Sequence, residues 1–151
     1  MLASCSDDTT AKIWKIEGGL QHNLEGHQKE IFTLRWTPCG EKSPNPDKPL
    51  LLCTASFDGS VKVWDAKLGT LVFNLCKQVQ PVYSLSPSPN GEFIATGSLG
   101  GNVSIWSLKE GVLQKDTQGV GDTFDVTWNH DGSLLCACFS SGTIYVMDTK
   151  S

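Results

Sequence analysis

Three residue types that can together perform acyl transfer occur in this 151-residue chain: His27, Ser56 and Asp58. A Ser–His–Asp set hydrolyses an ester or peptide bond when the serine stands on a sharp turn between a strand and a helix. Ser56 instead precedes Phe57 and Asp58, which begin a tight turn between two predicted strands. This context disfavours a hydrolase, and the chain shows no paired carboxylates or phosphate-binding loop. We therefore predict that the protein is not an enzyme and carries no cofactor.

The cysteines are a second set of potentially reactive groups, at positions 5, 39, 53, 76, 136 and 138. None of them forms a CxxC pair and no histidine has zinc-finger spacing, which argues against a metal site. Cys136 and Cys138 are two residues apart on a predicted strand, so they share a face and suit packing better than a disulfide. We expect buried, reduced thiols, as in a protein of the cytosol or nucleus.

The composition is that of an ordinary globular protein, with 39% apolar and 19% charged residues. The net charge is −4 and the twelve lysine and arginine residues are scattered singly. This pattern argues against direct binding of nucleic acid, which requires clustered positive charge, and leaves a basic partner as an alternative. The first ten residues lack the basic stretch and the long apolar run of a signal peptide, so we do not expect one there. No apolar run reaches the ~20 residues of a membrane span, so we expect no membrane partner.

The elements that must position these residues recur about every 41 residues along the chain. Each copy reads apolar run, small residues, polar turn, then alternating apolar positions: LASCSDDTTAKIW, LCTASFDGSVKVW, IATGSLGGNVSIW and LCACFSSGTIYVM. Trp64 and Trp106 are 42 residues apart, whereas Trp14 and Trp64 are 50 apart because of the insertion EKSPNPDKP at 41–49. A fixed period near 40 is typical of repeat proteins, which makes interaction the first functional hypothesis.

The pattern predicts an all-β chain of fourteen strands separated by glycine-containing turns, with no helix of useful length. We label the strands of one repeat a to d. The chain then divides into residues 1–26 (strands b–c–d), a complete set at 27–77, a second and degenerate set at 78–119, and residues 120–151 (strands a–b–c). Three prolines in the insertion 41–49 favour an extended, solvated excursion between strands a and b.

A family resemblance rests on Glu25-Gly26-His27 before one a strand and on Trp64-Asp65 at the end of the following c strand. Gly-His and Trp-Asp at this spacing resemble the WD40 repeat of β-propellers. The resemblance implies about three and a half four-stranded blades, an open part of a larger ring of about eight. Three explanations of the open ring compete: a fragment of a longer protein, a truncated gene model, or two copies that complete each other.

A closer resemblance is carried by KEIFTLRWTPCG, NPDKPLLLCTASFDGSVKVWDAKLG, PVYSLSPSPNGEFIATGS and GDTFDVTWNHDG. These stretches are similar to the C-terminal repeats of the transducin-β-like family, F-box-like WD-repeat proteins of histone-deacetylase corepressor complexes. The Asn-Pro insertion distinguishes this family from generic WD40 repeats. The resemblance implies a nuclear scaffold, with the cytoplasm as a second location, that binds corepressor and histone-deacetylase components or histone tails. The alternative is a WD40 scaffold or substrate receptor of a ubiquitin ligase, signalling or RNA-processing complex.

The resemblance also implies a buried polar relay in which His27 bonds Asp58 and Ser56, while Ser56 accepts the indole N–H of Trp64. A neutral imidazole suits such a site because it offers one donor and one acceptor. In the third repeat Lys77-Gln78 replaces Gly-His, Gly100 replaces the aspartate, and in the last repeat Met147 replaces the tryptophan. We therefore expect His27→Ala to cost more stability than Gln78→Ala. The corresponding relay residues in the other repeats are Ser6, Asp8, Trp14, Ser98 and Trp106.

The loops between strands d and a and between b and c form one face of a propeller, and we expect partner-binding residues there. Phe32, Tyr83 and Phe124 each lie eight residues before the glycine that ends strand a. They either pack between blades or anchor a partner near the channel mouth, with Tyr83 the strongest candidate. Phe57 and Leu99 are apolar at tight turns and have the same two interpretations. The polar candidates on this face are Asp7, Lys29, Glu30, Gln80, Asp122 and Ser140.

Overall fold

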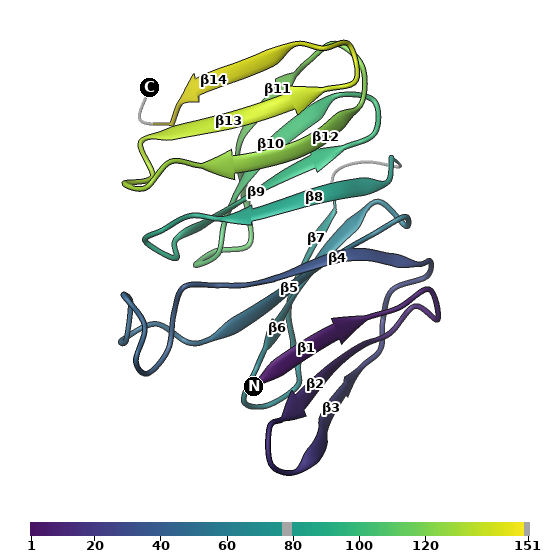
Figure 1. Ribbon diagram of the computed structural model, residues 1–151, viewed down its shortest axis with the longest axis vertical. Helices are drawn as coiled ribbons and strands as arrows, with labels where there is room; N and C mark the ends of the chain where they lie inside the picture. The colour runs from purple at the N-terminus through teal and green to yellow at the C-terminus, as the bar shows by residue number, and fades with distance from the viewer. Residues whose placement is uncertain (77–79, 150–151) are drawn as a thin grey trace.

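The computed structural model describes residues 1–76 and 80–149, and these consist of strands and turns (Figure 1). The strands number fourteen in the described residues, as predicted. Their bounds are β1 Leu2–Cys5, β2 Ala11–Lys15, β3 Gly19–Leu24, β4 Ile31–Trp36, β5 Leu51–Ser56, β6 Ser60–Asp65, β7 Leu71–Cys76, β8 Val82–Pro87, β9 Phe93–Ser98, β10 Asn102–Ser107, β11 Leu113–Gln118, β12 Thr123–Trp128, β13 Leu134–Phe139 and β14 Ile144–Asp148.

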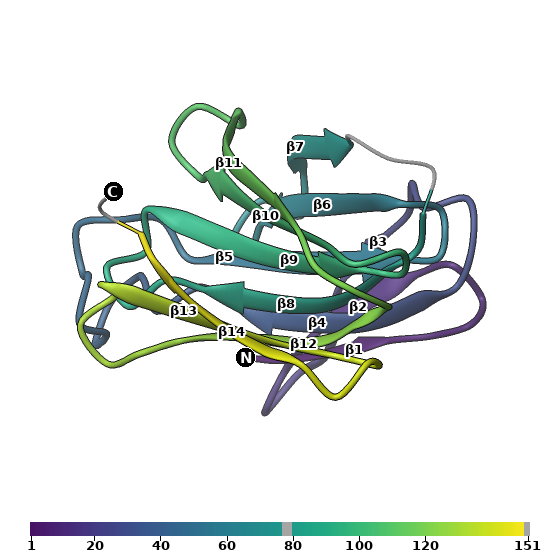
Figure 2. The ribbon, with the colours of Figure 1, turned by 90° about the horizontal axis from the view of Figure 1, so that it is seen from above.

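The strands form four antiparallel sheets in which sequence neighbours pair: β1–β2–β3, β4–β5–β6–β7, β8–β9–β10–β11 and β12–β13–β14. Figure 1 shows the sheets stacked one after another, and Figure 2 shows β7 and β11 at the edge opposite β4 and β8. Strand β8 contacts both β4 and β12, which places the first strand of each of these sheets on the inside. The predicted all-β, open propeller segment is confirmed.

The core lies between sheets rather than within one, because the central strands of the second and third sheets are covered on both faces. Every residue of β5 is buried. On one face Leu52 belongs to the same apolar cluster as Ile13 of the preceding sheet. On the other face Cys53 belongs to the same cluster as Leu85 of the following sheet. Alternate side chains of β5 therefore face the preceding sheet and the following sheet, and none of them faces solvent. This explains why the sequence of β5 is mainly apolar instead of alternating between apolar and polar residues.

The inner strands β4, β8 and β12 each contain a β-bulge at the equivalent position. The register shifts between Ile31 and Thr33 in β4, and equivalent shifts occur in β8 and β12. The extra residue is Phe32 in the first case, Tyr83 in the second and Phe124 in the third. A bulge leaves its extra residue out of the ladder and re-aims its side chain. The recurring aromatic positions are therefore bulge positions.

The insertion 41–49 is mainly exposed to solvent, as its prolines predict, but it is not extended. It folds back into turns, with an isolated bridge between Cys39 and Asn45. The Asn45 side-chain amide donates to Pro38 O at 2.6 Å and to Pro89 O at 2.9 Å. Lys48 Nζ donates to Asn90 O at 2.6 Å, so the insertion fastens to the β8–β9 turn of the next sheet. The prolines lack N–H donors, and Asn45 supplies the donors that hold the segment down.

We predict that Asn45→Ala lowers the free energy of unfolding by about 1–3 kcal/mol, because the carbonyls of Pro38 and Pro89 lose their shared donor. Urea unfolding followed by tryptophan fluorescence measures the effect. Asp47→Ala, an exposed change in the same insertion, serves as the control and should leave stability nearly unchanged. Equal losses in the two variants would contradict the fastening role of Asn45.

Candidate functional site: an interaction face above a polar relay

The relay is built around His27, which lies in the loop between β3 and β4 and is 4% exposed. Its Nδ1 is 2.9 Å from Asp58 Oδ2, and its Nε2 is 2.8 Å from Thr54 Oγ1. The indole Nε1 of Trp64 donates to the same Thr54 oxygen at 3.0 Å. The carboxylate can only accept, so Nδ1 carries the proton and Nε2 accepts from the Thr54 hydroxyl. The chain of bonds joins the β3–β4 loop to β5 and β6.

Asp58 fixes one end of this network. Its carboxylate accepts from the backbone N–H groups of Gln28 and Ser60, both at 2.9 Å, and from the Ser60 hydroxyl at 2.6 Å. Partial burial raises the pKa of Asp58, but the hydrogen bonds from Ser60, Gln28 and His27 outweigh it and lower the pKa to about 2. Asp58 is therefore ionised throughout the physiological range.

Burial dominates the titration of the imidazole. Desolvation lowers the pKa of His27 below its ordinary value of 6.5, and the neighbouring Asp58 carboxylate only partly offsets this. Lys62 lowers the pKa further through its positive charge. His27 is thus neutral at pH 7, which agrees with the single donor and single acceptor that the geometry requires.

The relay hydroxyl belongs to Thr54, and the prediction that Ser56 fills this place is wrong. Trp64 lies opposite Leu52 in the β5–β6 pair, so Thr54 is its diagonal neighbour on the same face. A long aromatic side chain reaches this diagonal position. Ser56 lies another two residues along β5, where its hydroxyl donates to Lys29 O at 3.0 Å and accepts from Asp58 N at 3.0 Å.

The same two-residue correction applies to Trp14 and Trp106, the tryptophans at the equivalent positions of the first and third sheets. Trp14 Nε1 donates to Ser4 Oγ at 2.9 Å rather than to Ser6, and Trp106 Nε1 donates to Thr96 Oγ1 at 3.2 Å rather than to Ser98. A hydroxyl ten residues before each of Trp14, Trp64 and Trp106 is the sequence signal that identifies the relay residue. Ser6 and Asp8 instead shape the β1–β2 turn, and the Ser98 hydroxyl is buried without a hydrogen-bond partner among the described residues.

The third and fourth sheets hold the equivalent region together differently. Lys77 and Gln78, which replace Gly-His, lie outside the described residues. At Gly100, the backbone N–H donates to Asp122 Oδ1 of the following loop at 2.8 Å, and Gln118 Nε2 donates to its carbonyl. In the last sheet the predicted loss of the relay corresponds to an apolar cluster that includes Ala137, Phe139, Tyr145 and Met147.

Above the relay, three aromatic rings from two sheets form a contiguous cluster. Phe32 and Tyr83 stack with ring centroids 3.9 Å apart and planes tilted by 31°. Phe57, on the β5–β6 turn, meets them edge-on at 5.8 Å and 6.3 Å. Phe32 remains 44% exposed, so the cluster both packs between sheets and presents a ring to solvent. Phe124 is 54% exposed and has no ring contact with this cluster among the described residues.

The other face candidates fall into two groups. The backbone N–H groups of Phe57 and Leu99 donate to Glu30 O and Pro81 O at 3.0 Å and 2.9 Å, and both side chains are half-buried. Asp122 is also half-buried, with its carboxylate engaged by Gly100, so it holds the loop in shape. The exposed members of the face are Asp7, Lys29, Glu30, Gln80 and Ser140.

The cysteines are all free thiols, but they are not uniformly buried as predicted. Cys39 and Cys53 are buried, and Cys76 is exposed at the end of β7. Burial, with a smaller contribution from Cys39, raises the pKa of Cys53 to about 12, so this thiol stays protonated. The described residues contain no cluster of three side chains arranged to hold a metal ion. They also contain no helix that is long and apolar enough to span a membrane.

This geometry of three- and four-stranded antiparallel sheets, recurring Trp–hydroxyl bonds and a His–Asp pair defines a repeat class. The family model described as WD domain, G-beta repeat matches residues 1–15, 18–65, 69–107 and 112–148. The chain belongs to the WD40 repeat family.

Three relatives are similar to this chain over nearly its whole length. WD40 repeat-containing protein HOS15 of Arabidopsis thaliana is 50% identical over 99% of this chain. F-box-like/WD repeat-containing proteins TBL1Y of Homo sapiens and TBL1X of Mus musculus are 42% and 40% identical over 97% and 98% of it. The similarity to F-box-like WD-repeat proteins is thereby confirmed. The chain spans 25% of HOS15 and 36% of each of the other two.

We predict that Thr54→Val lowers the free energy of unfolding by about 1–3 kcal/mol, because it leaves His27 Nε2 and Trp64 Nε1 buried without a partner. The matched change Thr96→Val should cost less, since only Trp106 Nε1 donates to that hydroxyl. Urea unfolding of both variants decides the point. A larger loss for Thr96→Val would show that the histidine adds nothing to the relay.

Stability should fall as the solution is acidified from pH 7.5 to 5.5. The unfolded chain protonates His27 near its ordinary pKa, whereas the folded chain, with a lowered pKa, resists protonation, so acid favours unfolding. The contribution of Asp58 is lost only below pH 3.8, as the pH falls toward 2. In His27→Gln the free energy of unfolding should change less between the two pH values than in the wild type. An equal or steeper change in the variant would exclude His27 as the source.

Proposed function

We propose that this protein is a non-enzymatic interaction scaffold whose partner binds the face formed by the loops at the right of Figure 1. The observation that carries the proposal is the cluster of Phe32, Phe57 and Tyr83, in which bulges place aromatic rings at a rim that solvent reaches. Aromatic side chains that are rigidly held and partly exposed are the usual anchors of protein interfaces.

The charge around the cluster favours a basic segment of the partner. Asp7 and Glu30 are exposed on this face and Lys29 is the opposing charge. A lysine- or arginine-rich peptide such as a histone tail satisfies the carboxylates and can lay a cation or an alkyl chain on the Phe32 ring. The relay beneath holds the β3–β4 and β5–β6 loops in position, so its role is to keep this surface rigid.

The biological setting that we propose is a nuclear corepressor complex containing histone deacetylase. Support comes from the 40–42% identity to the F-box-like/WD repeat-containing proteins TBL1X and TBL1Y. The insertion at 41–49, on which the family resemblance rests, is also a built part of the fold, tied to the next sheet by Asn45. A role in another WD40 assembly is the competing proposal, and the experiment below separates the two.

Tyr83→Ala in the full-length protein should reduce recovery of corepressor and histone-deacetylase components at least tenfold in quantitative affinity purification, because a central aromatic anchor is lost. Ile16→Ala is the matched control: Ile16 is an apolar side chain, 86% exposed, on the opposite set of loops. Urea unfolding of each variant separates a lost contact from a lost fold.

Two outcomes would overturn the proposed setting. One is recovery of corepressor components no better than with an unrelated propeller. The other is enrichment of ubiquitin-ligase, signalling or RNA-processing components instead. An equal effect of Tyr83→Ala and Ile16→Ala would overturn the assignment of the interaction face.

A further inference from the structure

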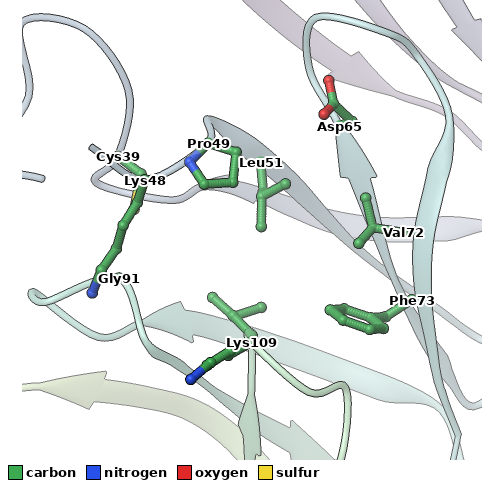
Figure 3. A pocket seen from close by; sticks show the side chains of 10 residues that line it. Cys39, Lys48, Pro49, Leu51, Asp65, Val72, Phe73, Gly91 and Lys109 are labelled. Carbon is green, nitrogen blue, oxygen red and sulfur yellow. The ribbon is translucent and has the colours of Figure 1, made fainter. Parts of the chain in front are cut away.

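A second surface lies at the other end of the sheets, between β4–β7 and β8–β11. It is a pocket of about 460 Å³ whose walls are mainly apolar (Figure 3). Side chains from both sheets and from the insertion line it, principally Lys48, Leu51, Val72, Phe73, Leu108 and Lys109. A volume of this size is within the usual range of ligand-binding pockets, about 300–1,000 Å³.

The pocket is built by two irregular features of the backbone. The register of the β6–β7 pair shifts between Val63 and Trp64, which makes Val72 the extra residue of a bulge, 41% exposed. Phe73 beside it packs so closely over Gly111 that any side chain there would collide with the ring. The insertion supplies the facing wall through Lys48 and Pro49, which the Asn45 amide holds in place.

Exposed apolar side chains also occur on the segments that lie next to the pocket-lining residues in the sequence. Leu68 of the β6–β7 turn, Leu71 at the start of β7 and Val112 of the β10–β11 turn are 64%, 46% and 45% exposed. The two sheets that carry these residues are each packed against a sheet on either side, so the exposure is not that of a free sheet face. A mainly apolar pocket with exposed apolar side chains on the adjoining segments fits a peptide better than a small molecule.

The charged side chains around the pocket differ in how far they are already paired, and this indicates which charge a partner should carry. Lys109 is exposed and its ammonium group has no hydrogen-bond or ion-pair partner among the described residues. Lys48 Nζ lies 3.1 Å from Glu92 Oε1 and is partly neutralised. The Asp65 carboxylate accepts the backbone N–H groups of Lys67 and Leu68 at 2.8 Å, so it is already engaged. Figure 3 shows Asp65 at one side of the pocket and the two lysine side chains at the other.

We propose that this pocket binds a short acidic segment of a partner protein. One large apolar side chain of that segment, leucine or phenylalanine in class, enters between Leu51, Val72 and Phe73. A carboxylate of the segment pairs with Lys109. The site is independent of the aromatic face, because the β4–β5 and β6–β7 loops that border it lie at the opposite ends of the strands from Phe57.

The test measures fluorescence anisotropy of the full-length protein with two labelled octapeptide pools. One pool carries leucine or phenylalanine at a fixed central position among aspartate and glutamate, and the other carries lysine in place of the acidic residues. The acidic pool should bind at least tenfold more tightly. Lys109→Glu and Val72→Glu should each weaken its binding at least tenfold, whereas Lys29→Glu, the same charge change on the aromatic face, should alter it less than twofold.

Equal binding of the two pools, or equal effects of Lys109→Glu and Lys29→Glu, would overturn the proposal. Laurate serves as a small-molecule probe that carries an apolar chain and one carboxylate. Saturable binding of laurate without binding of the acidic pool would also overturn the proposal. Urea unfolding checks that each variant is folded, and Lys109→Gln provides a milder version of the charge change. Tyr83→Ala should leave the acidic pool bound, so failure at one surface is distinguishable from failure at the other.

Discussion

Face-to-face packing of one sheet on the next is the constraint on which the whole structure depends. A single four-stranded sheet such as β4–β7 cannot bury both faces by itself, and it becomes stable only between two neighbours. The buried clusters that contain Leu52 and Cys53 are these two interfaces. Because the buried core lies between the faces of the sheets, the turns at both ends of the strands do not have to supply core side chains. They are free to carry an aromatic cluster at one end and an apolar pocket at the other.

Much of this organisation could be predicted from the sequence because it is periodic. The tryptophans, the turn glycines and the β-branched alternation repeat with the sheets, so element type and order follow from the spacing alone. The relay hydroxyl could not be placed as reliably. Thr54 and Ser56 are both small, both on β5 and both buried. Only the pairing register, which sets Leu52 opposite Trp64, decides between them.

The insertion and the aromatic positions show a different limit. Three prolines in 41–49 indicate a segment without regular hydrogen bonds, and they do not reveal that Asn45 bonds the next sheet. Phe32, Tyr83 and Phe124 were recognisable as a recurring set, yet two of them stack and the third stands apart. Equivalent positions diverge because each meets a different neighbour: Phe57 completes the first pair, whereas Leu99 replaces it in the next sheet. Contacts between repeats, unlike the repeats themselves, leave no periodic signal.

The junction between the second and third sheets is fastened at both ends of its strands, by the stacked rings of Phe32 and Tyr83 and by the amide of Asn45. Two fasteners on opposite sides of an interface resist different deformations. The stacked rings oppose separation of the two sheets at one end of their strands, and the Asn45 amide opposes separation at the other end. Separating the two sheets at either end of their strands therefore requires one of these two contacts to break. We therefore expect the two sheets, and the two surfaces that they carry, to keep their relative positions when a partner binds at either surface.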